Sequence, residues 1–279
     1  GQIIPEEYFK VIKKKRGRKK KVEKIIVSDE ELNSENLPLL SYQSAYEITL
    51  DKNRKDKNKF GKSTIKEANG ELLLDWFNNC GSWSSNQRMF LSFLNSSGIG
   101  TVSDINYSIT EKNDGTEMTF ALQVKENNIL VQRVNGEANK GNKMKIKTFS
   151  PEEKILEFDD SVIFPHQHLK EIINNLGTKN SIFSAKVYEG SIPNNFLNIS
   201  TFVNEGSAKE NPELMPKEVI NKFWTVRMAY YKEKNQTPEM ELTANINRQG
   251  VVSYFKYDYP EYSLIMKLKK LIISPDMCK

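Results

Sequence analysis

YQSAYEITL, residues 42–50, decides the fold class, because mostly apolar and aromatic side chains alternate along it with mostly polar ones, at a period of two. One set of alternate positions comprises Tyr42, Ser44, Tyr46, Ile48 and Leu50. This spacing puts them on one face of a β-strand that is half buried in a sheet. Residues 51–58 are charged and carry no core residue, which is typical of a hairpin tip.

Similar short runs recur along the rest of the chain, with turn signals between them. The strongest turn signals are Asn113-Asp114-Gly115 and Asn135-Gly136. The runs are residues 71–77, 87–94, 103–110, 117–124, 129–134, 144–149, 181–188, 196–203, 224–231, 240–247, 251–257 and 263–273. Many strands at this spacing predict an all-β domain, either a sandwich, a barrel or a long meander. Residues 204–217 are polar and predict a loop.

One helix interrupts the strands, over about residues 165–176. Pro165 suits a first helical turn, and Gly177 ends the pattern. The apolar residues at helical spacing are Leu169, Ile172, Ile173 and Leu176. His166 and His168 would point in nearly opposite directions on this helix, which is wrong for sharing a metal. We expect one of them on the surface and one packed.

Charge divides the 279 residues into a basic arm and a nearly neutral body. The net charge is +5, but residues 1–24 hold ten Lys or Arg against three Glu, which is +7 and leaves −2 for the rest. An acidic stretch follows, so we expect a disordered arm over residues 1–40 and one domain over residues 41–279. No apolar run has the roughly eighteen residues of a transmembrane helix.

The arm carries a polyanion-binding pattern around Arg16-Gly17-Arg18. Its basic residues are Lys13, Lys14, Lys15, Arg16, Arg18, Lys19, Lys20 and Lys21. Such a run fits the minor groove of DNA, an anionic membrane surface or a plain solvated tail. The body offers no second basic surface, so a nucleic-acid-associated protein is the alternative function rather than the first.

The two cysteines, Cys80 and Cys278, allow a disulfide, two free thiols or half of a metal site. No CxxC or HxxxH spacing supports a metal. Buried free cysteines would be ordinary, but Cys278 follows the last predicted strand, where little would bury a thiol. A bond to Cys80 would tie that strand to the early sheet, and disulfides persist outside the reducing cytosol.

Motifs of catalysis and cofactor binding are absent from the sequence. It contains no GxSxG, no GxGxxG and no GxxxxGK[ST]. The acidic pairs at residues 152–153 and 159–160 are adjacent on an extended chain, so their side chains diverge. We expect no enzyme, no cofactor and no metal.

Five segments of the chain together resemble the motifs of one known protein family. They are YQSAYEITL at 42–50, GELLLDWFNNCGSWSSNQR at 70–88, FPHQHL at 164–169, VYEGS at 187–191 and the near-terminal Cys278. In this order they resemble the opening strand, the first cysteine region, the entry to the helix, a turn and the last cysteine of the EipB family of bacterial cell-envelope-integrity proteins. The arm departs from the family, whose members begin with a secretion signal.

The resemblance implies a single antiparallel sheet that spirals on itself, a Cys80–Cys278 disulfide and a periplasmic location. It also implies a non-enzymatic role in envelope integrity, through an envelope protein or a lipid or peptidoglycan component. We expect a monomer. A spiral sheet has a concave face, where Trp76, Trp83, Trp224 and Tyr254 would line a groove for an apolar peptide or acyl chain.

Overall fold

The alternation in residues 42–50 places a strand at the centre of the sheet. In the computed structural model, β1 (Tyr42–Leu50) pairs antiparallel with β2 (Ile65–Asn78) on one side and β15 (Ser263–Ile273) on the other. Its buried side chains are Tyr42, Ser44, Tyr46 and Ile48, as the pattern predicts. The structure describes residues 37–54, 65–179, 181–232 and 235–278, and the unit that begins at Pro38 is the one considered below.

The other elements follow in chain order. The strands are β3 (Ser82–Asn95), β4 (Gly100–Lys112), β5 (Glu117–Glu126), β6 (Ile129–Lys140), β7 (Met144–Ser150), β8 (Lys154–Phe158), β9 (Val162–Ile163), β10 (Ser181–Val187), β11 (Leu197–Ala208), β12 (Phe223–Tyr231), β13 (Met240–Ile246) and β14 (Val252–Asp258). Helix α2 (Pro165–Asn174) follows β9, and the 3₁₀-helix η2 (Pro212–Leu214) follows β11. Within the described ranges, no helix is both long and apolar enough to cross a bilayer.

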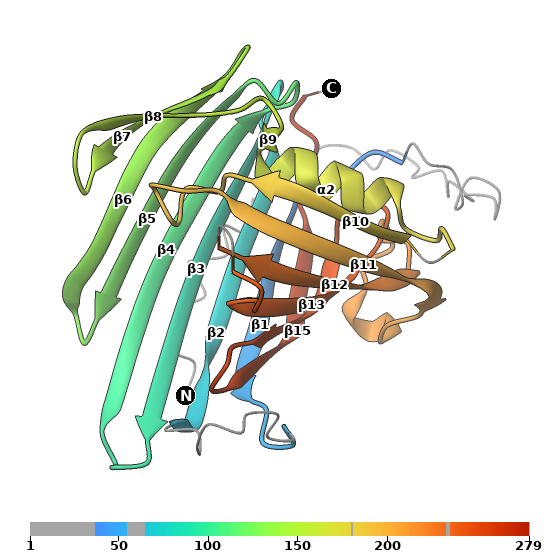
Figure 1. Ribbon diagram of the computed structural model, residues 1–279. Coiled ribbons are helices and arrows are strands. Elements are labelled where there is room, and N and C mark those ends of the chain that lie inside the picture. The colour runs from blue at the N-terminus through green and yellow to red at the C-terminus, as the bar shows by residue number, and fades with distance from the viewer. Residues whose placement is uncertain (1–36, 55–64, 180, 233–234, 279) are drawn as a thin grey trace, which may run out of the picture. The chain divides into compact units, whose positions relative to one another are not determined.

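The fifteen strands found in the described residues belong to one sheet, in the order β8-β7-β6-β5-β4-β3-β2-β1-β15-β14-β13-β12-β11-β10-β9. Neighbouring strands are antiparallel except for β9 and β10, which are parallel. The two edge strands, β8 and β9, are joined by only Asp159, Asp160 and Ser161. The sheet therefore curls until its edges meet and nearly closes into a barrel, with one wall crossing in front of the other (Figure 1). The predicted all-β class with a single curled sheet is confirmed.

Element boundaries differ from the sequence prediction in several places. Strand β11 continues into the predicted loop at 204–217, as far as Ala208. The short strands β8 and β9 were not predicted, because five and two residues are too few for a periodic pattern. The predicted arm falls outside the described residues, apart from residues 37–40. Part of the predicted 51–58 hairpin tip also falls outside them.

Helix α2 packs between the two walls of the curled sheet. Ile172, Ile173 and Leu176 belong to the core cluster that includes β10–β13. Phe164, which precedes the helix, belongs instead to the cluster built from β4–β7. The helix ends at Asn174, and Gly177 turns the chain with a φ of +77°. The helix therefore packs against both halves of the sheet, while Glu171 and Asn174 remain exposed.

The structure contains the Cys80–Cys278 disulfide, and the pairing of β1 explains how the two cysteines meet. Tyr42 lies opposite Trp76 of β2 and opposite Ile273 of β15, so the end of β2 and the end of β15 lie on either side of one residue. The chain after β15 then runs past the start of β1, where the Ser274 N–H donates to the Ser41 carbonyl (2.9 Å). Cys80 in the β2–β3 turn lies beyond it, with 5.2 Å between the two cysteine Cα atoms.

Removing this bond should lower the free energy of unfolding without changing the fold. The bond closes a loop with a sequence separation of 198 residues, so it strongly restricts the unfolded chain. The Cys80→Ser/Cys278→Ser double variant should lose about 2–5 kcal/mol, measured by urea unfolding. Reductant should lower the midpoint of the parent protein and leave that of the variant unchanged. Equal midpoints for parent and variant would contradict the role given to the bond.

Candidate functional site

Two tryptophans and a histidine stack on the inner face of the sheet. Trp76 of β2 and Trp83 of β3 have ring centroids 5.2 Å apart and nearly parallel planes. The His166 ring of α2 lies 5.6 Å from each of them and is stacked on Trp83. Residues 79–81 form the turn between the antiparallel strands β2 and β3. In this hairpin Asn78 lies opposite Trp83 and Trp76 lies opposite Ser85, so the two tryptophans are diagonal neighbours on one face.

This stack forms one wall of a cavity of about 220 Å³. Strands β2, β3 and β4 supply most of the lining, and the start of α2 and the turn after β10 complete it. The lining residues are Trp76, Trp83, Ser85, Gln87, Tyr107, Ile109, Glu111, Pro165, His166, Leu169 and Glu189. Apolar rings and several polar groups thus face one space, which is the usual composition of a binding pocket.

Glu111, at the end of β4, joins the sheet to the helix. Its carboxylate accepts hydrogen bonds from the backbone N–H of His166 (2.6 Å) and of Gln167 (3.3 Å). These are free N–H groups of the first helical turn, and Phe164 at the N-cap position supplies no side-chain bond to them. Burial raises the Glu111 pKa to about 7, although the two hydrogen bonds act in the opposite direction. A negative charge here also suits the positive end of the helix dipole.

Three polar atoms in the aromatic wall have no hydrogen-bond partner in the described part of the chain. They are both ring nitrogens of His166 and the indole Nε1 of Trp76. His166 is only 2% exposed, and burial lowers its pKa to about 4, so the ring is neutral at pH 7. Buried polar groups are normally hydrogen-bonded, so three unpartnered atoms in one wall are unusual for a protein interior.

The opposite wall carries a second carboxyl group. The Tyr107 hydroxyl donates to the backbone carbonyl of Glu189, and the Ser191 hydroxyl donates to the Glu189 side chain. Burial raises the pKa of Glu189. The cavity therefore has an aromatic side, behind whose surface three unpartnered polar atoms are buried, and a side that holds a carboxyl of raised pKa.

The four aromatic residues proposed as groove lining do not gather in one place. Trp76 and Trp83 line the cavity. Trp224 packs in the other core cluster, with the Arg248 guanidinium 4.9 Å from its ring. Tyr254 of β14 lies opposite Lys267 of β15. The next residue, Phe255, packs in the core, and neighbouring residues of a strand face opposite sides of the sheet. Tyr254 therefore lies on the outer face of the sheet and is not part of the lining.

The expectation for the two histidines is wrong in one respect, because both are buried. His168 points away from His166, as predicted, but it packs near Phe183 and lies 3.5 Å from the Thr201 hydroxyl. The helix has the sheet on both sides, so neither ring reaches the surface. Sequence reasoning also missed Glu111, although it extends the alternation of Ile105, Tyr107 and Ile109 and so should face inward.

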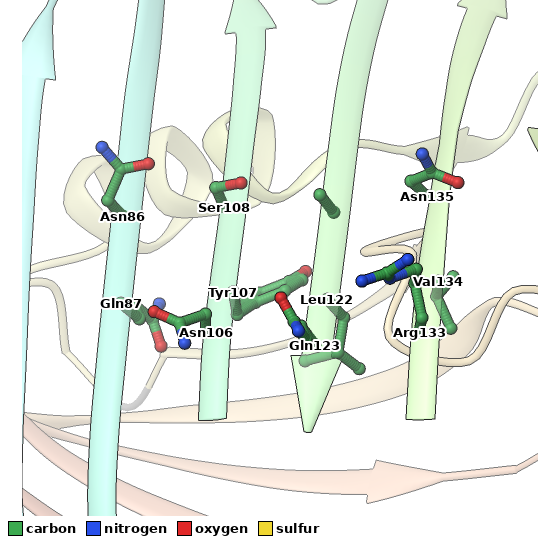
Figure 2. A pocket seen from close by; sticks show the side chains of 11 residues that line it. Asn86, Gln87, Asn106, Tyr107, Ser108, Leu122, Gln123, Arg133, Val134 and Asn135 are labelled. Carbon is green, nitrogen blue, oxygen red and sulfur yellow. The ribbon is translucent and has the colours of Figure 1, made fainter. Parts of the chain in front are cut away.

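A second, shallower hollow of about 400 Å³ lies over β3–β6. Its polar lining includes Asn86, Asn106, Ser108, Gln123, Arg133 and Asn135. Register places these residues on the face opposite Tyr107, Leu122 and Val134, and Figure 2 shows the two sets pointing to opposite sides of the strands. The hollow is therefore on the outside of the sheet. No predicted site residue lies there.

Comparison with known proteins is consistent with this fold. A crystal structure described as a beta-barrel-like protein of Domain of Unknown Function DUF1849 from Brucella abortus superposes with a TM-score of 0.78 and 22% sequence identity. The match covers 86% of this chain and 100% of the other, and at this identity it shows a shared fold. Comparison with the curated proteins finds no match.

The sequence also matches a family model, which confirms the resemblance seen in the five segments. The model is described as EipB-like, and the match covers residues 33–275. This range includes all the strands, the helix and the residues that line the inner cavity. The chain belongs to the EipB-like family.

Proposed function

We propose that this protein is a non-enzymatic protein of the periplasm that supports cell-envelope integrity by binding an envelope component. The observation that carries the binding role is the inner cavity with its three unpartnered polar atoms. Trp76 and Trp83 offer flat apolar surface, and His166 offers ring nitrogens at the same wall. A ligand with an apolar body would pack against the tryptophans, and a turn of the His166 ring would bring one ring nitrogen to a polar group of that ligand.

The disulfide supports the periplasmic location. Disulfides persist in oxidising compartments, of which the bacterial periplasm is one, and are rare in the reducing cytosol. Membership of the EipB-like family supports the envelope role.

The state of the titratable groups supports a role without catalysis. A catalytic histidine is normally oriented by a third group, whereas neither ring nitrogen of His166 has a partner in the described chain. The Glu111 carboxylate is already engaged by the backbone of α2. Both groups therefore serve the packing of the helix and the shape of the cavity.

Loss of the cavity should weaken the envelope of the natural host. Deleting the gene should increase sensitivity to detergent, and the exported parent protein should restore resistance. A Trp76→Ala/Trp83→Ala variant should restore less at equal protein level, because the aromatic wall is gone. Ser85→Phe, which would fill the cavity while keeping the tryptophans, should fail in the same way. Plating efficiency on detergent measures each strain.

Tyr254→Ala is the matched control, since it removes an aromatic side chain from the outer face, and it should restore resistance fully. Cell fractionation should recover the protein from the periplasm with both thiols protected until they are reduced. Detergent resistance that does not change on gene deletion would refute the envelope role. Free thiols in a cytoplasmic fraction would refute the location alone.

Acid should destabilise the fold partly through His166. Its pKa is about 4 in the folded protein and 6.5 in the unfolded reference, so the unfolded state binds the proton first as pH falls. Stability is therefore lost between about pH 6.5 and pH 4. His166→Phe keeps a stacking ring and cannot titrate, so between pH 7 and pH 4.5 it should lose about 2 kcal/mol less than the parent.

Urea unfolding at the two pH values measures this difference. Glu111 acts with the opposite sign, because its raised pKa destabilises the fold as pH rises towards 7, but it is present in both proteins and cancels. An equal loss of stability in the parent and in His166→Phe would show that His166 is not buried as a neutral ring.

A further inference from the structure

We propose that the first half of β6 is a docking edge, where an extended segment of another protein adds as a β-strand. Strand β6 pairs with β5 from Ile129 to Asn139, but β7 pairs with it only from Asn135 to Lys140. Residues 129–134 thus have a neighbouring strand on one side only. Figure 1 shows this half of β6 at the margin of the sheet, below β7 and β8, with no strand beyond it. We call residues 129–134 the open edge.

The open edge carries unpaired backbone groups. In an antiparallel strand, successive residues direct their N–H and C=O groups alternately to the two sides. The β5 ladder satisfies one side, and among the described residues no backbone bond outside the sheet ladders reaches the open edge. Its free donors and acceptors have the spacing of a strand, so another extended polypeptide matches them best.

Aliphatic side chains accompany these backbone groups. Ile129, Leu130 and Val131 are 68%, 44% and 53% exposed. Ile99 and Val102 extend the apolar surface at the adjacent hairpin end, and the Asn127 N–H donates to the Val102 carbonyl (2.8 Å). Successive residues of a strand face opposite sides of the sheet, so these aliphatic side chains would flank an added strand on both faces.

The open edge lacks most of the features that normally prevent strand addition, although the register shift at Val131 is a bulge, which is one of them. Natural edges are short, or they carry Lys, Pro or an inward charge. Residues 129–134 are ILVQRV, with no Lys and no Pro. The terminal strands of the sheet differ: β9 has only two residues, and β8 has five and begins with Lys154.

The edge is also formed in advance of binding. Asn127 and Asn128 have φ angles of 49° and 64°, the left-handed pair that a two-residue hairpin turn requires. Pairing with β5 holds the strand in place on both sides of a bulge at Val131, where the register shifts. A partner would therefore bear the cost of ordering only its own segment.

Arg133 adds a preference for charge in the partner. It lies at the inner end of the open edge and lines the outer hollow beside Gln123 (Figure 2). No ion pair of Arg133 is found in the described chain. An added strand with apolar residues at alternate positions and an acidic residue at this end would fit both features. A lipid surface would contact the aliphatic side chains but leave the backbone groups unpaired.

A labelled synthetic peptide of alternating Val and Thr that ends in Glu tests this surface. It should bind the parent protein in a fluorescence anisotropy titration. The same peptide methylated at every backbone nitrogen should not bind, because it keeps the side chains but loses its N–H donors. Leu130→Lys/Val131→Lys should weaken binding by about tenfold or more, since lysine protects a strand edge. Both replaced side chains are exposed, so the unfolding midpoint should stay that of the parent.

Ile155→Lys is the matched control, since Ile155 is a 64% exposed aliphatic on β8, and it should bind the peptide as the parent does. Equal binding of the methylated peptide, or no binding of either peptide, would overturn the proposal. So would parent-like binding by the Leu130→Lys/Val131→Lys variant.

Two further measurements test whether a lipid surface or a second copy of the chain, rather than a strand of another protein, occupies this surface. Binding to phosphatidylethanolamine–phosphatidylglycerol vesicles that is lost in the Leu130→Lys/Val131→Lys variant, without peptide binding, would assign the edge to a lipid surface. A dimer in sedimentation velocity that this variant abolishes would assign it to a second copy of the chain. Either result overturns the proposal for a foreign strand. None of these measurements involves the inner cavity, so they are independent of the proposed function.

Discussion

The pairing of β1 with β15 is the constraint on which the rest of the structure depends. It joins the first described strand to the last and merges two runs of consecutive strands into one sheet. It also places the end of β15 beside the end of β2, where Cys278 meets Cys80. Without it, each half would have an additional open edge. The inner cavity depends on it too, because the walls that enclose α2 belong to the two different halves.

Helix α2 is held at both ends by side chains that are distant in the sequence. The Glu111 carboxylate accepts a hydrogen bond from a free N–H group at the start of the helix. The Arg248 guanidinium donates to the Leu176 carbonyl just beyond the end of the helix (2.9 Å). Both charges suit the helix dipole. The helix is too short to be stable alone, so these contacts and its apolar packing fix its position. The position of His166 against Trp83 follows from this anchoring, and so does the shape of the cavity.

The sequence was informative about most local features, but the predicted turn at Asn135-Gly136 is wrong, because both residues lie inside β6. The alternation in residues 42–50, the helix that begins at Pro165 and the turn at Asn113-Asp114-Gly115 all correspond to the structure. Contacts between distant residues were not predictable, because they depend on register. Tyr254 on the outer face and Phe255 in the core are adjacent residues, and the sequence alone does not determine which of the two faces inward. The contact between Glu111 and α2 joins residues far apart in the chain. The open edge of β6 depends on where β7 begins to pair.

The order of strands in the sheet also determines how the chain can fold. Every pair of neighbouring strands except β1 and β15 is consecutive in the chain. Apart from the parallel pair β9 and β10, each half can therefore grow by antiparallel pairing of strands that are consecutive in the chain. One pairing is long-range, because β15 must pair with β1 across almost the whole chain. The entropic cost of closing this long loop falls on that single step. The bond between Cys80 and Cys278 joins the same two halves, so a disulfide formed early would shorten this search and one formed late would lock its result.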